Sequence, residues 1–267
     1  MLEARNITLR RGDRSILRNV DACIAPGSVT VILGPNGAGK STLLSCLAGD
    51  LSVQAGDVTL DSRALSLWRK PELAMRRAVL PQKSHLAFPF TVHEVAELGL
   101  LAAGSSRDAR QRPSRRDVIC RSLARVGMAD HAARMYHHLS GGEQQRVHIA
   151  RILCQLDQII ATGATPYLLL DEPVSSLDLR HQLETLDIAR DFADSGGGVL
   201  AILHDVNLAS LYADNVLVMA DGRVEASGPP QETLTTEIIS RIFDVPVILN
   251  RTPRRERPYL LPHTARD

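Results

Sequence analysis

The chain has 267 residues, of which 44% are hydrophobic and 23% charged, and its formal net charge is +1 at neutral pH. This composition supports a buried core and excludes a disordered chain, and the length suits one large α/β domain or a domain with an insertion. Because aromatic residues make up only 3% and the charge is nearly balanced, neither base stacking nor electrostatic attraction favours a nucleic-acid partner, and we expect none.

Apolar periodicity predicts strands that alternate with helices along the chain. Strands are predicted at residues 7–10, 15–25, 27–33, 56–61, 167–170, 199–203 and 216–219. Helical spacing is found at residues 40–48, across most of 86–160, and at 232–243. The strand at 216–219 is followed by Asp221-Gly222, which predicts a hairpin.

Strands separated by helices indicate a mainly parallel sheet that is covered on both faces. We therefore predict an α/β fold with a core made of residues 1–85 and 161–230. Residues 86–160 are predicted to form an inserted helical subdomain, and residues 231–267 a C-terminal helix and tail. The first strands, at 7–10 and 15–25, are predicted to pair in antiparallel fashion.

A glycine-rich loop, GPNGAGKS at residues 34–41, fits the pattern G-x-x-x-x-G-K-[ST] and lies between a buried strand and a helix. In that setting backbone N–H groups surround a β-phosphate, Lys40 bridges the β- and γ-phosphates, and Ser41 holds Mg²⁺ through its hydroxyl. An ordinary glycine turn is the alternative, and the strand–loop–helix context disfavours it. The predicted nucleotide-binding residues are Gly34, Pro35, Asn36, Gly37, Ala38, Gly39, Lys40, Ser41 and Thr42.

Two acids end a second buried strand, in YLLLDEP at residues 167–173. Water is a poor nucleophile at neutral pH, so a carboxylate within hydrogen-bond reach is needed to activate it. With a phosphate loop in the same chain, Asp171 is predicted to contact Mg²⁺ and Glu172 to polarise the attacking water. Taken alone, the pair would be read as a charged loop after a strand.

The segment LSGGEQQR at residues 139–146 precedes a further helix and predicts a second anion-binding helix N-terminus. One nucleotide does not need two such sites in the same subunit. Two copies packed head to tail would use each site once for every ATP. The residues assigned to this second nucleotide contact are Ser140, Gly141, Gly142, Glu143 and Gln144.

With these motifs in order, residues 1 to about 230 resemble the ATP-binding-cassette (ABC) transporter ATPases. The resemblance implies a P-loop NTPase core with a mainly parallel sheet, an N-terminal antiparallel β subdomain and an inserted helical subdomain. It also implies ATP and Mg²⁺ as cofactors. Gln82, in AVLPQKS, resembles the glutamine loop that senses Mg²⁺ and water, and His204 resembles the switch histidine that contacts the γ-phosphate. SSLD, at residues 175–178, resembles the loop that meets its counterpart across the dimer.

The chain departs from the family's pattern at the position of the aromatic ring that stacks on adenine. Arg11, in LRRGDRSIL, occupies the matching position. A guanidinium can also stack on a base. A solvated arginine is the alternative reading, and it leaves open how adenine is held.

Three segments resemble one particular branch of the ABC transporter ATPases. HLAFPFTVHEVAELG and the stretch from LHDVN to PQETLT are similar to the branch that energises import of iron chelates, cobalamin and haem. CQLDQIIATGATP, at residues 154–166, is read as a lengthened link after the helix that follows LSGGEQQR, similar to that of hemin importers. We expect hemin import, with an iron-siderophore or cobalamin importer as the alternative. A soluble ABC ATPase of DNA repair or translation is disfavoured, because the chain has neither a long coiled coil nor a second cassette.

The resemblance also implies partners. We expect a homodimer of ATPase subunits, two transmembrane permease subunits, and a periplasmic or lipoprotein substrate-binding protein. No run approaches the roughly 18 apolar residues that a membrane-spanning helix needs, and the first residues lack the apolar segment of a secretory signal. The expected location is therefore peripheral, on the cytoplasmic face of the inner membrane.

Overall fold

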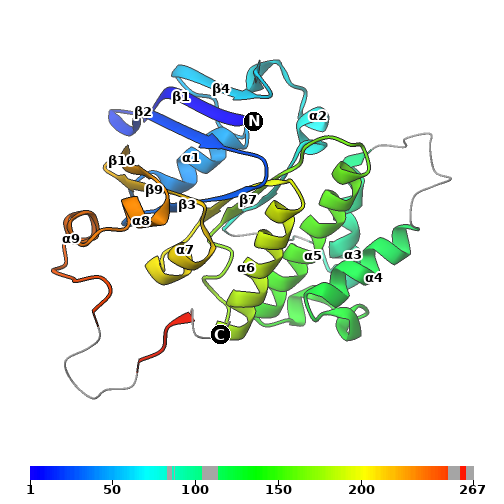
Figure 1. The fold of residues 1–267 in the computed structure, drawn as a ribbon. Helices are drawn as coiled ribbons and strands as arrows, with labels where there is room; N and C mark the ends of the chain where they lie inside the picture. Colours follow the sequence, from blue (N-terminus) through cyan, green and yellow to red (C-terminus); the bar gives the residue numbers. More distant parts are fainter. Residues whose placement is uncertain (83–85, 87, 104–113, 252–258, 263–267) are drawn as a thin grey trace.

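The computed structural model describes residues 1–82, 86, 88–103, 114–251 and 259–262. Its named strands form a four-stranded antiparallel sheet and a six-stranded sheet (Figure 1). The first sheet has the order β2 (Arg14–Ile24), β1 (Leu2–Arg11), β4 (Ala55–Leu60) and β5 (Arg63–Ala64). The second has the order β10 (Arg223–Gly228), β9 (Asn215–Ala220), β3 (Ser28–Leu33), β8 (Gly198–Ile202), β7 (Tyr167–Asp171) and β6 (Arg77–Leu80).

Helices connect these strands. The α-helices are α1 (Lys40–Leu47), α2 (Lys70–Ala74), α3 (Val92–Glu97), α4 (Arg115–Arg125), α5 (Gly141–Ile160), α6 (Leu179–Asp194), α7 (Val206–Tyr212), α8 (Pro230–Thr233) and α9 (Thr236–Phe243). Short 3₁₀ turns are η1 (Leu65–Leu67), η2 (Leu98–Ala103), η3 (Ala129–His131) and η4 (Tyr136–His138). None of the described helices is long and apolar enough to cross a membrane.

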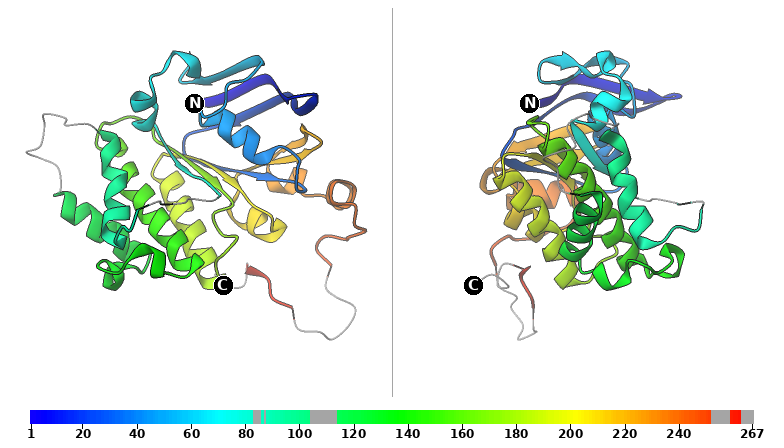
Figure 2. Two further views of the ribbon diagram at one scale, coloured as in Figure 1. Left: turned by 180° about the vertical axis from the view of Figure 1, so that it is seen from behind. Right: turned by 90° about the vertical axis from the view of Figure 1, so that its right-hand side faces the viewer.

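The six-stranded sheet is buried on both faces. Alternate residues of a strand point to opposite faces, and β3 divides accordingly: Val31 and Leu33 join one core, and Ile32 joins the other. The first core contains the helices between β6 and β7 together with α6 and α7, and the second contains α1 and the antiparallel sheet. Figures 1 and 2 show the antiparallel sheet and the helical segment on opposite sides of the central sheet.

The predicted fold class is confirmed: β9, β3, β8, β7 and β6 pair in parallel, and only β10 is antiparallel, at the edge. The predicted hairpin at Asp221-Gly222 joins β9 to β10. Helices α3, α4 and α5 lie between β6 and β7, as a helical insertion.

Two expectations about helix ends are wrong. The segment at residues 154–166 is not a long link, because α5 continues to Ile160 and only residues 161–166 connect it to β7. The apolar spacing of the helix continues through Leu156 and Ile159, which are buried and hold this last part in the core.

The helix predicted at residues 232–243 is two helices. Thr235 is extended, with φ −100° and ψ 158°, and its hydroxyl accepts a hydrogen bond from the Ile238 N–H as the N-cap of α9. A capping threonine satisfies a free donor at a helix start. The chain therefore leaves α8 after Thr233 and begins α9 at Thr236.

Candidate functional site

The predicted catalytic groups follow neighbouring strands of one sheet. The phosphate loop follows β3, His204 follows β8, Glu172 follows β7, and Gln82 follows β6. These four strands are parallel neighbours, so their carboxyl ends lie along the same edge of the sheet. Ligands of open α/β sheets bind outside that edge.

The phosphate loop needs glycine at two positions where other chain segments approach closely. A Cβ on Gly34 would lie 2.0 Å from the Met219 carbonyl oxygen, in β9. A Cβ on Gly39, which has φ +99°, would lie 2.9 Å from the Ile16 carbonyl oxygen. The loop is therefore packed between β2 and β9, and its backbone leads directly into the first turn of α1.

Lys40 is folded back onto this loop. Its Nζ donates to the carbonyl oxygens of Gly34, at 2.8 Å, and Pro35, at 2.9 Å. Lys40 is buried, and burial lowers the pKa of its ammonium, while the carboxylates of Glu172 and Asp171 oppose that shift. The charge thus lies close to Asp171, the last residue of β7, and to Glu172, which follows it.

Ser41 and Asp171 come together although they are far apart in the sequence. The Ser41 hydroxyl donates to Asp171 Oδ1 at 3.0 Å. Burial raises the pKa of Asp171, and the Ser41 hydrogen bond opposes that rise. A hydroxyl and a carboxylate at this distance are hard oxygen donors of the kind that suit Mg²⁺.

Glu172 is held from both sides. Its Oε1 lies 2.8 Å from His204 Nε2, and its Oε2 accepts from Gln82 Nε2 at 2.8 Å. Burial opposes ionisation of Glu172, but the hydrogen bonds from His204 and Gln82 outweigh it and lower its pKa below the usual value. The backbone of Glu172 has φ +52°, a left-handed conformation that costs free energy for a residue with a side chain.

The LSGGEQQR segment forms a capped helix start. Ser140 is the N-cap of α5, its hydroxyl accepting from the Glu143 N–H, and Glu143 Oε2 accepts in return from the Ser140 N–H. Donation to Glu143 Oε2 by the Ser140 N–H, and also by the Ser140 hydroxyl, lowers the pKa of Glu143. Gln144 donates to the Leu139 carbonyl at 3.1 Å. A Cβ on Gly141 would have no atom within 4 Å, so this face of the helix start is open.

The structure does not bring all of the predicted residues to one place. No hydrogen bond or ion pair of the described residues joins the segment 140–144 to the phosphate loop. Arg11 ends β1, where it is exposed and in register with Arg14. Within one subunit, the β7 acids, Lys40, Gln82 and His204 form one cluster, and the α5 start forms another.

Known proteins resemble the chain throughout its length. The family model described as ABC transporter matches residues 17–175.

The chain belongs to the ABC transporter family.

Relatives of this ABC transporter cassette cover nearly the whole chain. The Agrobacterium fabrum protein named Hemin import ATP-binding protein HmuV is 47% identical over 99% of this chain and 99% of its own length. The Rhizobium meliloti protein of the same name is 43% identical over the same shares. A solved dimeric ATP-binding cassette in a post-hydrolysis state, bound to ADP and Pi, is 25% identical with a TM-score of 0.73 and covers 86% of this chain and 99% of that one.

Sequence reasoning about this ABC cassette missed a contact between α5 and α6. Arg146, the last residue of LSGGEQQR, contacts His181 in α6, 35 positions away. His181 lies outside every motif that we identified, and a single sequence carries no signal that would pair the two.

Proposed function

We propose that the chain is the ATP-hydrolysing subunit of an ABC import complex that energises uptake of hemin across the inner membrane. The observation that carries this proposal is the cluster at the edge of the sheet, where Glu172, His204 and Gln82 meet beside Lys40 and the phosphate loop. Two relatives that are 43% and 47% identical over nearly the whole chain are named as hemin import proteins, and these names support hemin as the cargo.

In this proposal residues 34–42 bind the phosphates of ATP. Lys40 leaves the carbonyls of Gly34 and Pro35 to contact the β- and γ-phosphates. Glu172 orients and polarises the attacking water, and His204 contacts the γ-phosphate. Ser41 and Asp171, joined at 3.0 Å, would hold Mg²⁺ together with Gln82, and the ion would supply charge neutralisation on the phosphates.

The nucleotide would be shared between two copies. Residues 140–144 stand apart from the phosphate loop of their own chain, which supports their use by a partner subunit. In a head-to-tail dimer each ATP lies between the phosphate loop of one subunit and the α5 start of the other. Dimeric ABC cassettes with the same fold support this arrangement. ATP then favours the closed dimer, because it binds that state more tightly.

The remaining parts of the complex follow from the same proposal. The helical insertion with α3, α4 and α5 would move when the dimer closes, and each copy would push on one of two transmembrane permease subunits. A periplasmic or lipoprotein substrate-binding protein would deliver the cargo. The chain would then lie peripherally, on the cytoplasmic face of the inner membrane.

Glu172→Gln tests the ATPase assignment. We expect phosphate release to fall at least about a hundredfold, while ATP remains bound and the full chain forms a stable dimer in ATP, measured by light scattering. Glu172→Gln combined with Gly141→Asp is the matched control, since a carboxylate at the α5 start should repel the partner's nucleotide and prevent dimer formation. Normal phosphate release by the Glu172→Gln chain would refute the role of Glu172.

Complementation tests the cargo. In a bacterial strain that lacks its hemin import ATPase but keeps the permease, the wild-type chain should restore growth with hemin as the sole iron source, and the Glu172→Gln chain should not. Strains that lack their ferric-siderophore or their cobalamin import ATPase, grown on those cargoes, separate the alternatives. Restoration of siderophore use without hemin use would replace the hemin assignment.

A further inference from the structure

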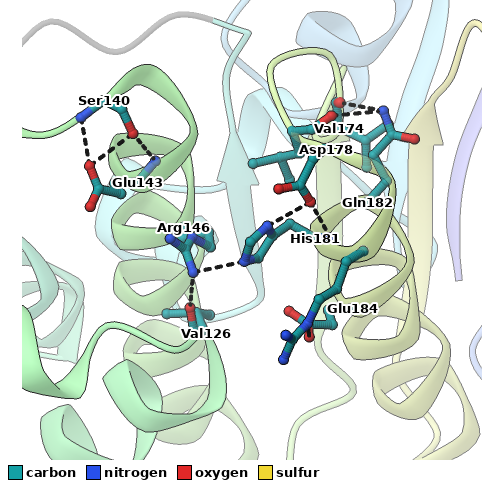
Figure 3. Close-up of polar contacts among 11 residues, drawn as sticks. Val126, Ser140, Glu143, Arg146, Val174, Asp178, His181, Gln182 and Glu184 are labelled. Atoms are coloured by element: carbon teal, nitrogen blue, oxygen red, sulfur yellow. Dashed lines mark hydrogen bonds and ion pairs between the residues drawn. The ribbon is translucent and has the colours of Figure 1, made fainter.

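The α5 helix and the start of α6 are joined by a row of three side chains (Figure 3). Arg146 Nη1 lies 3.0 Å from His181 Nε2, and His181 Nδ1 lies 2.7 Å from Asp178 Oδ1. Asp178 Oδ1 also accepts from the His181 backbone N–H at 3.0 Å, as the N-cap of α6. The row runs from the LSGGEQQR helix to the last residue of SSLD.

The chemistry of these groups fixes the direction of each hydrogen bond. A guanidinium has only donors, and an ionised carboxylate has only acceptors. His181 must therefore accept on Nε2 and carry its proton on Nδ1. Imidazole is the side chain that can accept from Arg146 at one end and donate to Asp178 at the other from two fixed ring positions.

Arg146 is itself anchored at a second point. Its Nη1 also donates to the Val126 carbonyl, at 3.4 Å, at the end of α4. Gly127, with φ +64°, follows directly, and a Cβ there would lie 3.3 Å from the same nitrogen. The guanidinium is thus held between the end of α4 and the start of α6 (Figure 3).

The two segments that this row joins also pack on each other. Gln145 Nε2 donates to the Pro173 carbonyl at 3.2 Å, and the Cα of Gly142 faces the Ser176 carbonyl, which a Cβ would approach to 3.3 Å. Pro173 follows Glu172 directly. The first turn of α5 is therefore connected to the segment that leaves the catalytic carboxylate.

We propose that His181 is a positioning residue that fixes residues 173–178 to α5 through Arg146, and so couples the two ATP sites of the dimer. The coupling rests on the proposed function. In a head-to-tail dimer, the α5 start of a subunit contacts the ATP that is bound to the phosphate loop of the partner. Glu172 of the same subunit acts on the ATP that is bound to the subunit's own phosphate loop. Because the α5 start and the segment after Glu172 are linked within one chain, binding of ATP at one site affects the position of the groups at the other site.

Two isosteric substitutions separate the halves of the row. The amide of Asn at position 181 reaches the place of Nδ1 and keeps the bond to Asp178, but it cannot reach Arg146. The amide of Gln reaches the place of Nε2 and keeps the bond to Arg146 without the bond to Asp178. We expect His181→Asn and His181→Gln each to lower kcat about tenfold, and to reduce the Hill coefficient for ATP toward one, with nucleotide affinity changed by less than about twofold. The measurements are ATP titrations of phosphate release and equilibrium binding of a non-hydrolysable ATP analogue to the full chain.

Arg146→Met keeps much of the packing of the side chain and removes its donors. It should reproduce both kinetic effects, and the Arg146→Met, His181→Asn double variant should be no worse than either single variant, because the two residues act through one link. Arg180→Ala is the matched control: Arg180 is exposed on the same helix, and the hydrogen bond and ion pair of its side chain among the described residues are with Glu184, one turn along. Its loss should therefore leave kcat and the Hill coefficient unchanged.

Thermal unfolding of each variant separates positioning from a structural role. Lower unfolding midpoints with wild-type kcat and Hill coefficient in His181→Asn, His181→Gln and Arg146→Met would overturn the proposal. So would full activity of His181→Asn alone, since the contact with Asp178 would then suffice and the contact with Arg146 would carry no coupling. Failure of the proposed function is a distinct result, in which the wild-type chain itself releases no phosphate.

Discussion

His204 Nε2 lies 2.8 Å from Glu172 Oε1, and the two residues follow neighbouring parallel strands, β8 and β7. On the other side, Gln82 occupies Oε2 at 2.8 Å. A carboxylate oxygen has two lone pairs, so each oxygen of Glu172 can still accept from a water. The pair of neighbours therefore sets the direction of the carboxylate without blocking its use as a base.

His204→Ala should lower kcat at least about tenfold, because it removes both the orienting contact to Glu172 and the proposed contact to the γ-phosphate. His204→Gln keeps a donor that can reach Glu172, and we expect it to retain more activity than His204→Ala. Steady-state phosphate release at saturating ATP is the measurement. Equal activity of the alanine variant and the wild type would remove His204 from the mechanism.

Arg11 offers a test of how adenine is held. If its guanidinium stacks on the base, Arg11→Ser should weaken ATP binding about two- to fivefold, a cation–π contribution of about 0.5–1 kcal/mol, and Arg11→Tyr should restore it. The measurement is equilibrium binding of ATP to the wild type and to both variants. Binding of a ribose triphosphate without a base is the comparison, because it lacks the ring on which Arg11 would stack. Equal affinities of wild type and Arg11→Ser would support the solvated arginine.

His148 predicts a pH dependence of stability. It lies buried in α5, with Nε2 2.7 Å from the Tyr136 hydroxyl, and burial lowers its pKa from 6.5 to about 4, with nearby Arg151 adding to the effect. The unfolded chain therefore binds a proton that the folded chain does not between these values. The contribution is fully present above pH 6.5 and is lost as the pH falls toward 4, by about 3 kcal/mol at about 1.4 kcal/mol per pKa unit.

Urea denaturation at pH 7 and at pH 4.5 measures this effect. His148→Gln removes the titrating group, so its free energy of unfolding should fall less between the two pH values than that of the wild type. Tyr136→Phe is the control, because it keeps the imidazole and should retain a steep fall. Identical pH profiles for wild type and His148→Gln would contradict the assignment.

Substitution of Gly99 tests how tightly η2 packs on α5. A Cβ there would lie 2.0 Å from the Arg151 carbonyl oxygen, so Gly99→Ala should force the two segments apart and cost about 1–3 kcal/mol of unfolding free energy. Gly163→Ala is the contrast: its position is open, and only the left-handed backbone, φ +73°, is unfavourable, at about 1 kcal/mol. The reverse order of thermal unfolding midpoints would contradict the packing argument.

Helix and strand identities were predictable where one local signal decided them. The run from Tyr167 to Leu170 is apolar at every position and becomes a strand buried on both faces. The ends of α5 and α9 were not predictable in the same way. Ile159 extends α5 because it is buried in the core, and Thr235 divides the last helical segment because its hydroxyl caps α9. Both outcomes depend on contacts or backbone geometry that hydrophobic spacing does not contain.

The sequence by itself determined which residues we propose to carry the chemistry, because the phosphate loop, the acids at the end of β7 and the glycines at the start of α5 need particular residue types in consecutive positions. The tertiary structure alone decided which of them meet. It brought Gln82 and His204 to Glu172 through the order of parallel strands, left residues 140–144 apart from the phosphate loop, and joined Arg146 to His181. The physical reason is that strand order and helix packing set distances between residues far apart in the chain, and local sequence patterns do not encode those distances.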